Sequence, residues 1–219
     1  MEHNPYQSLG DLPATLPVFP LTGALLFPRW PLPLNIFEPR YLNMFDDALA
    51  GDRLIGMIQT TGGGRANPTL ASVGCVGKIT AHSETGDGRY MVSLKGVIRF
   101  AINAELDVRK PYRQVSPDFT PFADDLSLPA PFETPTRAMI MTALKPYAAA
   151  KGLETDWDAI AEADIEILIS ALSAGCPFEM MEKQALLEAE DLQTRADILI
   201  QLMLLHTPHT QDDGDASLQ

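Results

Sequence analysis

The stretch "LNIFEPRYLNMF", residues 34–45, places a Glu-Pro-Arg triplet inside an otherwise apolar and aromatic run. Pro39 can occupy the first position of a helix, because its missing N–H would have no partner there anyway. Apolar residues then recur at helical spacing, and Gly51 supplies a stop. The pattern predicts a helix over 39–50 with one apolar face.

Glu38 and Arg40 flank this proline, and three roles are open to them. Glu38 lies at the positive end of the predicted helix, where its carboxylate can accept hydrogen bonds from free backbone amides. Arg40 stands in the first turn, against the same dipole, so we expect it to have a partner in the sheet. A structural link between helix and sheet is the favoured interpretation, and the alternatives are a clamp for a charged ligand and an acid–base pair.

The sequence on both sides of the helix is rich in β signals. Eight of the 18 prolines fall in the first 40 residues, which excludes a helix there and allows short edge strands. Short β-rich runs separated by glycine-containing turns follow at 53–60, 72–85, 88–102 and 112–119. Several short strands with one crossing helix predict a small, mostly antiparallel barrel or pseudo-barrel over 12–118.

The second half of the chain has helical periodicity. Apolar spacing predicts helices over 134–151, over 162–174, after Pro177 and over 192–206. The sequence therefore predicts an α+β chain that consists of a barrel, a linker over 119–133, a helical bundle over 134–206 and a disordered acidic tail over 207–219.

Charge is divided between these halves. Residues 1–118 carry 11 acidic and 11 basic side chains, whereas residues 119–219 carry 18 acidic and five basic ones, which accounts for the whole net charge of −13. An acidic half repels phosphate backbones, so this balance disfavours nucleic acid as a partner.

Motifs that carry chemistry are missing from the sequence. The two cysteines lie far apart and the four histidines have no ligand at zinc-site spacing, so we expect no metal, no cofactor and reduced thiols. We also expect no catalytic residues, because no nucleophile or nucleotide-binding motif occurs and adjacent carboxylates such as Asp46 and Asp47 suit a solvated surface. The N-terminus lacks the features of a signal peptide and no run is long enough to span a membrane, which predicts a cytoplasmic protein.

Four blocks of the sequence resemble the N-terminal, substrate-binding domain of Lon protease. They are "LPVFPLTGALLFPRWPLPLNIFEPRYLNMFDDAL" (16–49), "VGCVGKI" (73–79), "DGRYMVSLKGVIRF" (87–100) and "EKQALLEAEDLQTRADILIQLM" (182–203). The resemblance covers roughly residues 12–206 and implies a PUA-like β pseudo-barrel followed by an α-helical bundle. One departure is Arg29-Trp30, which stands where the family usually has glycine. Full Lon proteases continue into an ATPase and a Ser-Lys protease domain, and these 219 residues contain neither, so the resemblance implies a stand-alone, non-catalytic domain.

The resemblance favours a module that binds exposed apolar segments of unfolded or partner proteins, in quality control or as an adaptor. The candidate peptide-binding residues lie in a proline-rich run that we expect to be partly exposed along an edge strand, where an extended peptide could add as a further strand: Phe19, Leu26, Phe27 and Trp30. Six residues are assigned a structural role: Glu38, Pro39, Arg40, Tyr41, Arg89 and Tyr90. The alternative function is RNA binding by a PUA-like barrel, which would need a basic face built from Arg89, Lys95, Arg99 and Arg113.

Overall fold

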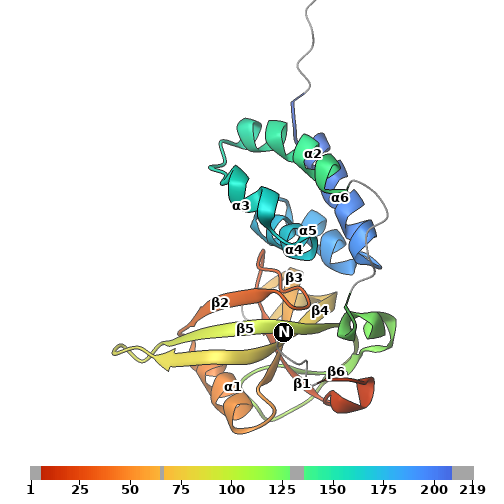
Figure 1. Cartoon of the computed structure of the whole chain (residues 1–219). Helices are drawn as coiled ribbons and strands as arrows, with labels where there is room; N and C mark the ends of the chain where they lie inside the picture. Colours follow the sequence, from red (N-terminus) through yellow and green to blue (C-terminus); the bar gives the residue numbers. More distant parts are fainter. Residues whose placement is uncertain (1–5, 65–66, 129–135, 209–219) are drawn as a thin grey trace, which may run out of the picture.

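A computed structural model describes residues 6–64, 67–128 and 136–208. The first half of the chain forms a curved β-sheet with one helix packed against it, and the second half forms a group of helices above one end of this sheet (Figure 1). The predicted order of a β half followed by a helical half is therefore confirmed. The predicted tail, 207–219, lies almost entirely outside the described residues.

Within the described residues, six strands make one sheet. They are β1 (Leu16–Pro20), β2 (Pro31–Ile36), β3 (Leu54–Gly64), β4 (Asn67–Glu84), β5 (Tyr90–Leu106) and β6 (Gln114–Asp118). Their order is β2-β5-β4-β3-β1-β6, and a further pairing of β5 with β6 closes a ring of strands. All of these strand pairs are antiparallel except β1 with β3. The sheet is mostly antiparallel, as predicted, contains one parallel pair, and is ring-like without being a full barrel.

Helix α1 (Pro39–Ala50) has the bounds that the sequence predicts. Its apolar face is buried against the sheet through four residues: Tyr41, Met44, Phe45 and Ala48. The ring of Phe19 on β1 meets that of Tyr41 edge-on, with their centroids 4.4 Å apart. Aromatic packing, which favours this geometry, therefore joins the helix to the sheet.

The helical half contains five α-helices among the described residues. They are α2 (Thr136–Lys151), α3 (Trp157–Glu162), α4 (Ile165–Gly175), α5 (Met180–Glu188) and α6 (Leu192–Leu205). Four of them match the predicted helices. The short α3 was not predicted, and its start is set by Asp156, whose carboxylate accepts a hydrogen bond from the Ala159 amide at 3.0 Å. The predicted linker, 119–133, contains a 3₁₀ helix, η2 (Thr120–Leu126), in which Asp125 is buried.

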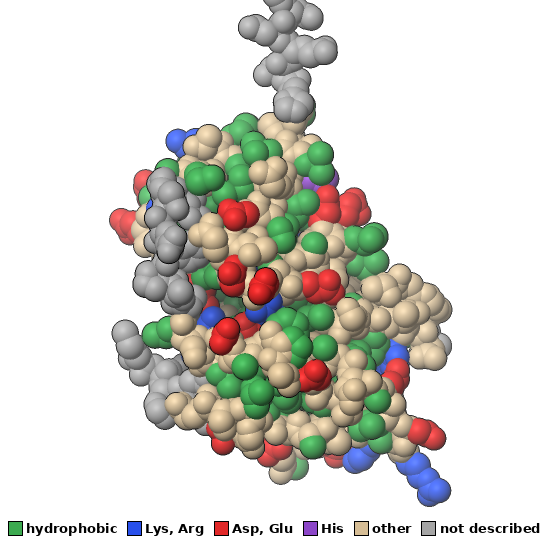
Figure 2. All heavy atoms as spheres, turned by 90° about the vertical axis from the view of Figure 1, so that its right-hand side faces the viewer, with side chains coloured by type: hydrophobic (Ala, Val, Ile, Leu, Met, Phe, Trp, Pro, Cys, Tyr) green, Lys and Arg blue, Asp and Glu red, His purple; other side chains and the backbone are tan. Residues whose placement is uncertain are grey.

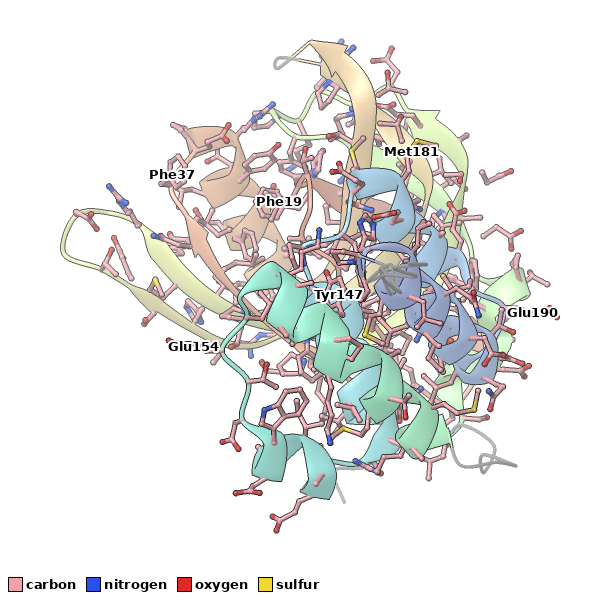
Figure 3. The ribbon with its side chains drawn as sticks, turned by 90° about the horizontal axis from the view of Figure 1, so that it is seen from above. Phe19, Phe37, Tyr147, Glu154, Met181 and Glu190 are labelled. Carbon is pink, nitrogen blue, oxygen red and sulfur yellow. The ribbon has the colours of Figure 1, made fainter. Side chains whose placement is uncertain are left out.

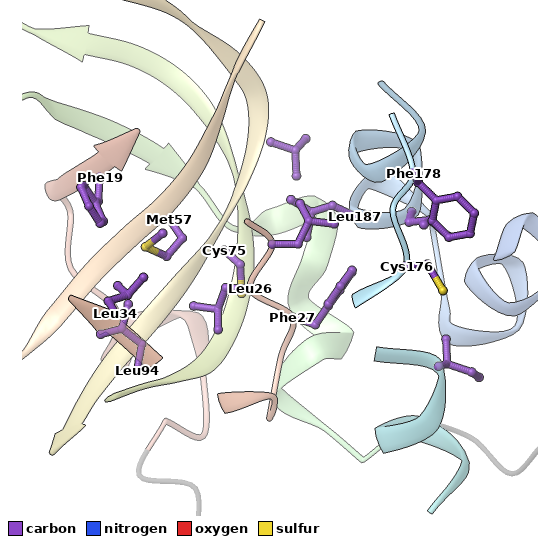
Figure 4. Close-up of a cluster of buried hydrophobic side chains, with 14 of the residues drawn as sticks. Phe19, Leu26, Phe27, Leu34, Met57, Cys75, Leu94, Cys176, Phe178 and Leu187 are labelled. Carbon is purple, nitrogen blue, oxygen red and sulfur yellow. The ribbon is translucent and has the colours of Figure 1, made fainter. Parts of the chain in front are cut away.

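One hydrophobic cluster runs through both halves of the molecule. Phe27 from the sheet half and Tyr147, Phe178 and Leu199 from the helical half belong to the same set of buried side chains, part of which Figure 4 shows. A second, smaller cluster around Phe100 fills the interior of the ring of strands. Since the larger cluster crosses the boundary, sheet and bundle share a core.

Candidate functional site

Three of the four predicted peptide-binding residues do not face solvent. Phe19, Leu26 and Phe27 are all buried in the core, so the expectation that they would be partly exposed is wrong for them. The reason is topological: β1 lies between β3 and β6, and Phe27 is covered by the Arg195 guanidinium, 4.6 Å from the centre of its ring. Only Trp30 is partly exposed.

The predicted edge strand is β2, which in the described part of the chain pairs with β5 alone. The Gly96 amide donates to the Trp30 carbonyl at 2.9 Å, so Trp30 directs its carbonyl toward β5. Every second residue after Trp30 directs its backbone N–H and C=O groups the same way. Pro31, Pro33 and Asn35 therefore turn theirs outward. Because proline has no N–H, two of these three positions offer no donor, and addition of a peptide strand at this edge is disfavoured.

Exposed apolar side chains gather instead on the outer face of the sheet beside this edge. Asn35 on β2 pairs with Met91 on β5, which in turn pairs with Ser83 on β4, so these three side chains point to one face. On the opposite face, Leu34 of β2 and its partner Val92 of β5 are buried. The side chains of Phe37, just after β2, and of Met91 are 60% and 46% exposed. We call the exposed apolar residues of this face the outer patch, and they are Pro31, Pro33, Phe37, Ala81 and Met91.

Phe37 lies at the margin of the molecule, beside α1 and the β4–β5 hairpin, whereas Phe19 lies toward the interior (Figure 3). The Arg89 guanidinium is 5.8 Å from the centre of the Phe37 ring and forms an ion pair with Asp87, with a nitrogen–oxygen distance of 2.9 Å. The phenol of the next residue, Tyr90, donates to Asp46 on α1 at 2.8 Å. Arg89 and Tyr90 thus have partners within the chain beside Phe37.

Glu38 and Arg40 differ from their predicted roles. The Arg40 guanidinium pairs with the Glu38 carboxylate at 3.0 Å, and both side chains are partly exposed. Glu38 makes no capping hydrogen bond to the helix. The expected link from Arg40 into the sheet is therefore absent from the described residues, because its partner is the neighbouring carboxylate, while its guanidinium lies over the ring of Tyr41, 4.5 Å from the centroid.

Polar links between α1 and the sheet come from residues that the sequence did not single out for this role. The adjacent carboxylates Asp46 and Asp47, which were expected to be solvated only, each accept a hydrogen bond from a tyrosine of the sheet half. The Tyr112 phenol donates to Asp47 at 2.6 Å, and Lys110 forms an ion pair with the same carboxylate at 2.9 Å. These hydrogen bonds lower the pKa of Asp47, and burial together with the Asp47 hydrogen bond raises the pKa of Tyr112.

The boundary between sheet and bundle is packed rather than open. Arg29 donates to Glu166 of α4 and to the backbone carbonyl of Asp125. Gln59 of β3 donates to Gln184 of α5 at 3.0 Å. The cleft that two separate domains would leave is thus filled by polar contacts and by the shared core.

The arginines that a basic face would require have acidic partners. Arg89 pairs with Asp87, and Arg99 is buried against Asp125. Arg113 pairs with Glu105, and acidic side chains gather where the bundle meets the sheet on the face that Figure 2 shows. This arrangement argues against RNA binding.

No three histidine, cysteine or carboxylate side chains within residues 6–64, 67–128 and 136–208 lie close enough to hold a metal ion. None of the helices in this part of the chain has the length and apolar character needed to cross a membrane.

Comparison with known proteins agrees with this architecture. The sequence profile of the ATP-dependent protease La (LON) substrate-binding domain matches residues 15–204. The chain is 26% identical to a Lon protease of Anaeromyxobacter dehalogenans and to Lon protease 2 of Myxococcus xanthus, in each case over 88% of this chain. It spans only 23% and 24% of the length of these two relatives.

Two solved structures have the same fold. A Lon N-terminal domain protein from Xanthomonas campestris superposes with a TM-score of 0.58 at 19% identity, covering 89% of this chain and 99% of that one. The N-terminal domain of a Mycobacterium avium complex Lon protease gives a TM-score of 0.60 at 19% identity, covering 86% and 97%.

Proposed function

The chain belongs to the family of LON substrate-binding domains, and we propose that it binds exposed apolar segments of unfolded proteins through the outer patch. The observation that carries the proposal is the exposure of Phe37 and Met91 on one face of the sheet, where their neighbours on the opposite face are buried. Large apolar side chains that stay exposed together mark surfaces for protein contact. We propose the outer patch as the binding site in place of Phe19, Leu26 and Phe27, because those three residues are buried.

Recognition at this patch rests on side chains and not on strand pairing. The outward positions of β2 offer few backbone donors, so a bound segment gains its affinity by covering Phe37 and Met91. Full burial of one large apolar side chain contributes about 1.5–3 kcal/mol, and ordering of the segment offsets part of that gain. We therefore expect dissociation constants of roughly micromolar or weaker, with little dependence on the sequence of the segment.

A domain of this kind serves protein quality control, either by holding unfolded chains or by handing them to a protease. The support is the family, whose description names substrate binding, and two relatives whose names are those of Lon proteases. The proposed partner is thus an unfolded polypeptide.

The test compares binding of a permanently unfolded protein and of its native form to the chain and to three variants. Phe37→Ser and Met91→Ser remove the outer patch anchors, and Met181→Ser removes an 80% exposed methionine on α5 as the matched control. We expect preference for the unfolded form, about tenfold weaker binding for the two patch variants and no change for Met181→Ser. Equal binding of both forms, or equal loss in all three variants, would refute the proposal.

A further inference from the structure

Two described residues other than glycine have a left-handed backbone, and both are arginines. Arg29 has a φ of 64° and Arg53 a φ of 59°. A side chain with a Cβ is strained in this conformation, which glycine and asparagine adopt more readily. Strain of this kind persists where the rest of the structure imposes it and is concentrated at functional positions.

Hydrogen bonds within the molecule offset the backbone strain at Arg29. Its guanidinium donates to the Glu166 carboxylate and to the carbonyls of Asp125 and Ser127, so this residue ties the β half to the bundle. The unusual backbone of Arg29 thus aims its side chain at partners that the chain itself provides.

Arg53 has no such partners. Its backbone is held, since its amide donates to the Ala48 carbonyl and its carbonyl accepts from Ile79, both at 2.9 Å. Its guanidinium, however, has no acceptor within hydrogen-bond distance in the part of the chain that the structure describes. The neighbouring Asp52 does not pair with it, although the Asp52 carbonyl accepts from Lys78 at 2.7 Å.

Arg53 stands where two hollows of the sheet half meet. Hollows of about 430 and 360 Å³ share Arg53 and the residues beside it in sequence, together with Pro13. The second hollow shares Lys110 and Tyr112 with a third one of about 240 Å³, which reaches Tyr41 at the N-terminal end of α1, so the three lie next to one another along this helix. We call these adjacent hollows the basal groove.

The lining of the basal groove mixes polar and apolar side chains, and its basic side chains other than Arg53 already have partners in the chain. Prolines and tyrosines recur along it: Tyr6, Pro13, Pro17, Tyr41, Pro111 and Tyr112. Lys78 donates to the Tyr6 phenol at 3.0 Å, and Lys110 pairs with Asp47 at 2.9 Å. In the described lining of this groove, Arg53 is thus the one cation for which the chain supplies no acceptor.

We propose that the basal groove binds an extended polypeptide segment in which one carboxylate, from a side chain or a chain end, pairs with Arg53 between flanking apolar side chains. The inference rests on the proposed function and adds to it a second contact site and a preference for acidic segments. A polyanion such as RNA fits less well than a segment with a single carboxylate, because Arg53 is the one unpaired cation of the described lining and further phosphates would meet the carboxylates that also line the groove: Asp11, Asp47, Asp52, Glu105 and Asp107. A lone small anion would leave the prolines and tyrosines of the lining unused.

The test begins with an array of overlapping peptides that tile an unrelated protein, probed with the chain at low salt. The strongest binders are then made as soluble fluorescent peptides, each with an amidated end and with its acidic residue either kept or changed to the amide. We expect bound peptides to contain an acidic residue and the acid-to-amide change to weaken binding about tenfold. Free-acid versions of the amide peptides show whether a chain end can replace the side chain.

Arg53→Gly is the decisive variant, because glycine accepts the left-handed conformation without strain. It should unfold at the same temperature as the parent chain or higher, and it should bind acid and amide peptides equally. Lys145→Gln, which removes one exposed charge from α2, should keep the preference. Equal binding of acid and amide peptides by the parent chain, an unaltered preference in Arg53→Gly, or no peptide binding at all would overturn the inference. The proposed function is judged separately by unfolded-protein binding to the Phe37 and Met91 variants.

Discussion

The Arg99 guanidinium on β5 and the Asp125 carboxylate in η2 form a buried bidentate ion pair, with nitrogen–oxygen distances of 2.8 and 2.9 Å. The Arg99 amide donates to the same carboxylate at 2.9 Å. The guanidinium also donates to the carbonyls of Leu187 and Glu190 around the end of α5. One buried arginine therefore holds the sheet, the connecting segment and the bundle together.

Loss of this arginine should strongly destabilise the whole chain. Arg99→Ala leaves the buried Asp125 carboxylate without its partner, so we expect a loss of about 3–5 kcal/mol in the free energy of unfolding. The exposed pair Arg89 and Asp87 is the control, and Arg89→Ala should cost less than about 1 kcal/mol. Urea unfolding followed by circular dichroism measures both values. A single transition is expected because the two halves share a core, and two separate transitions would contradict that view.

The motif pair Glu38 and Arg40 should contribute little to stability. Both side chains are partly exposed and pair only with each other among the described residues, so Glu38→Gln and Arg40→Met should each cost less than about 1 kcal/mol. Tyr41→Ala, by contrast, removes a buried ring that packs on Phe19 and should cost about 3–5 kcal/mol. A large loss of stability in Arg40→Met would instead support the link between Arg40 and the sheet that the sequence suggests.

The sequence predicts well those features that depend on near neighbours. Pro39 and Gly51 mark the ends of α1, and Asp191 caps α6 through the Thr194 amide at 2.7 Å. Links between distant residues were missed. Asp46 and Asp47 are separated by 44 and 65 residues from the tyrosines that bind them, and no local period reports such a pairing.

The exposure of the candidate peptide-binding residues was mispredicted for the same reason. Proline content correctly predicts an edge strand, but it does not tell which of the adjacent apolar residues the sheet covers. Phe19 and Phe27 are buried by elements far away in sequence, whereas the exposure of Met91 follows from its register opposite Asn35. Both outcomes depend on topology, which a single sequence does not specify.

Both thiols should be unreactive in the folded chain. Cys75 and Cys176 are free and buried. Burial raises the pKa of Cys75 far above its usual range and that of Cys176 to about 11, so almost no thiolate is present at neutral pH. A disulfide reagent that reports free thiols should therefore label neither cysteine in buffer and both in urea. Rapid labelling of the native protein would indicate local opening.

Stability should fall at both extremes of pH through the Asp47–Tyr112 hydrogen bond. The pKa of Asp47 is lower in the folded state than its ordinary value of 3.8, so its contribution is present above that pH and is lost as the pH falls below it. The pKa of Tyr112 is raised above its ordinary value of 10.0, so its contribution is present below pH 10.0 and is lost as the pH rises beyond it. When the melting temperature is plotted against pH, Asp47→Asn should have a lower maximum than the parent chain and shallower slopes on the acid and alkaline sides. Slopes as steep as those of the parent chain would assign the pH dependence to other groups.

Tyr147 on α2 should give the opposite result to Tyr112 when each is changed to phenylalanine. The Tyr147 side chain is fully buried, and its hydroxyl has no hydrogen-bond partner within the described residues. An unsatisfied buried hydroxyl costs roughly 1–3 kcal/mol, so Tyr147→Phe should raise the free energy of unfolding by about 1 kcal/mol. Tyr112→Phe removes a hydroxyl that donates to Asp47 and should lower it.

Tyr147→Phe should also change how the free energy of unfolding depends on pH in the alkaline range. Burial raises the pKa of Tyr147 to about 12 in the folded chain, so unfolding releases its proton more readily and stability falls as the pH rises above 10.0. Tyr147→Phe abolishes this contribution, and its advantage over the parent chain should grow between pH 10.0 and about 12. Urea unfolding at neutral and alkaline pH measures both effects. A loss of stability in Tyr147→Phe at neutral pH would contradict this prediction and would mean that the hydroxyl has a hydrogen-bond partner. That partner would be a bound water molecule, because a water bridge to a second polar group accounts for such a loss without any change in packing.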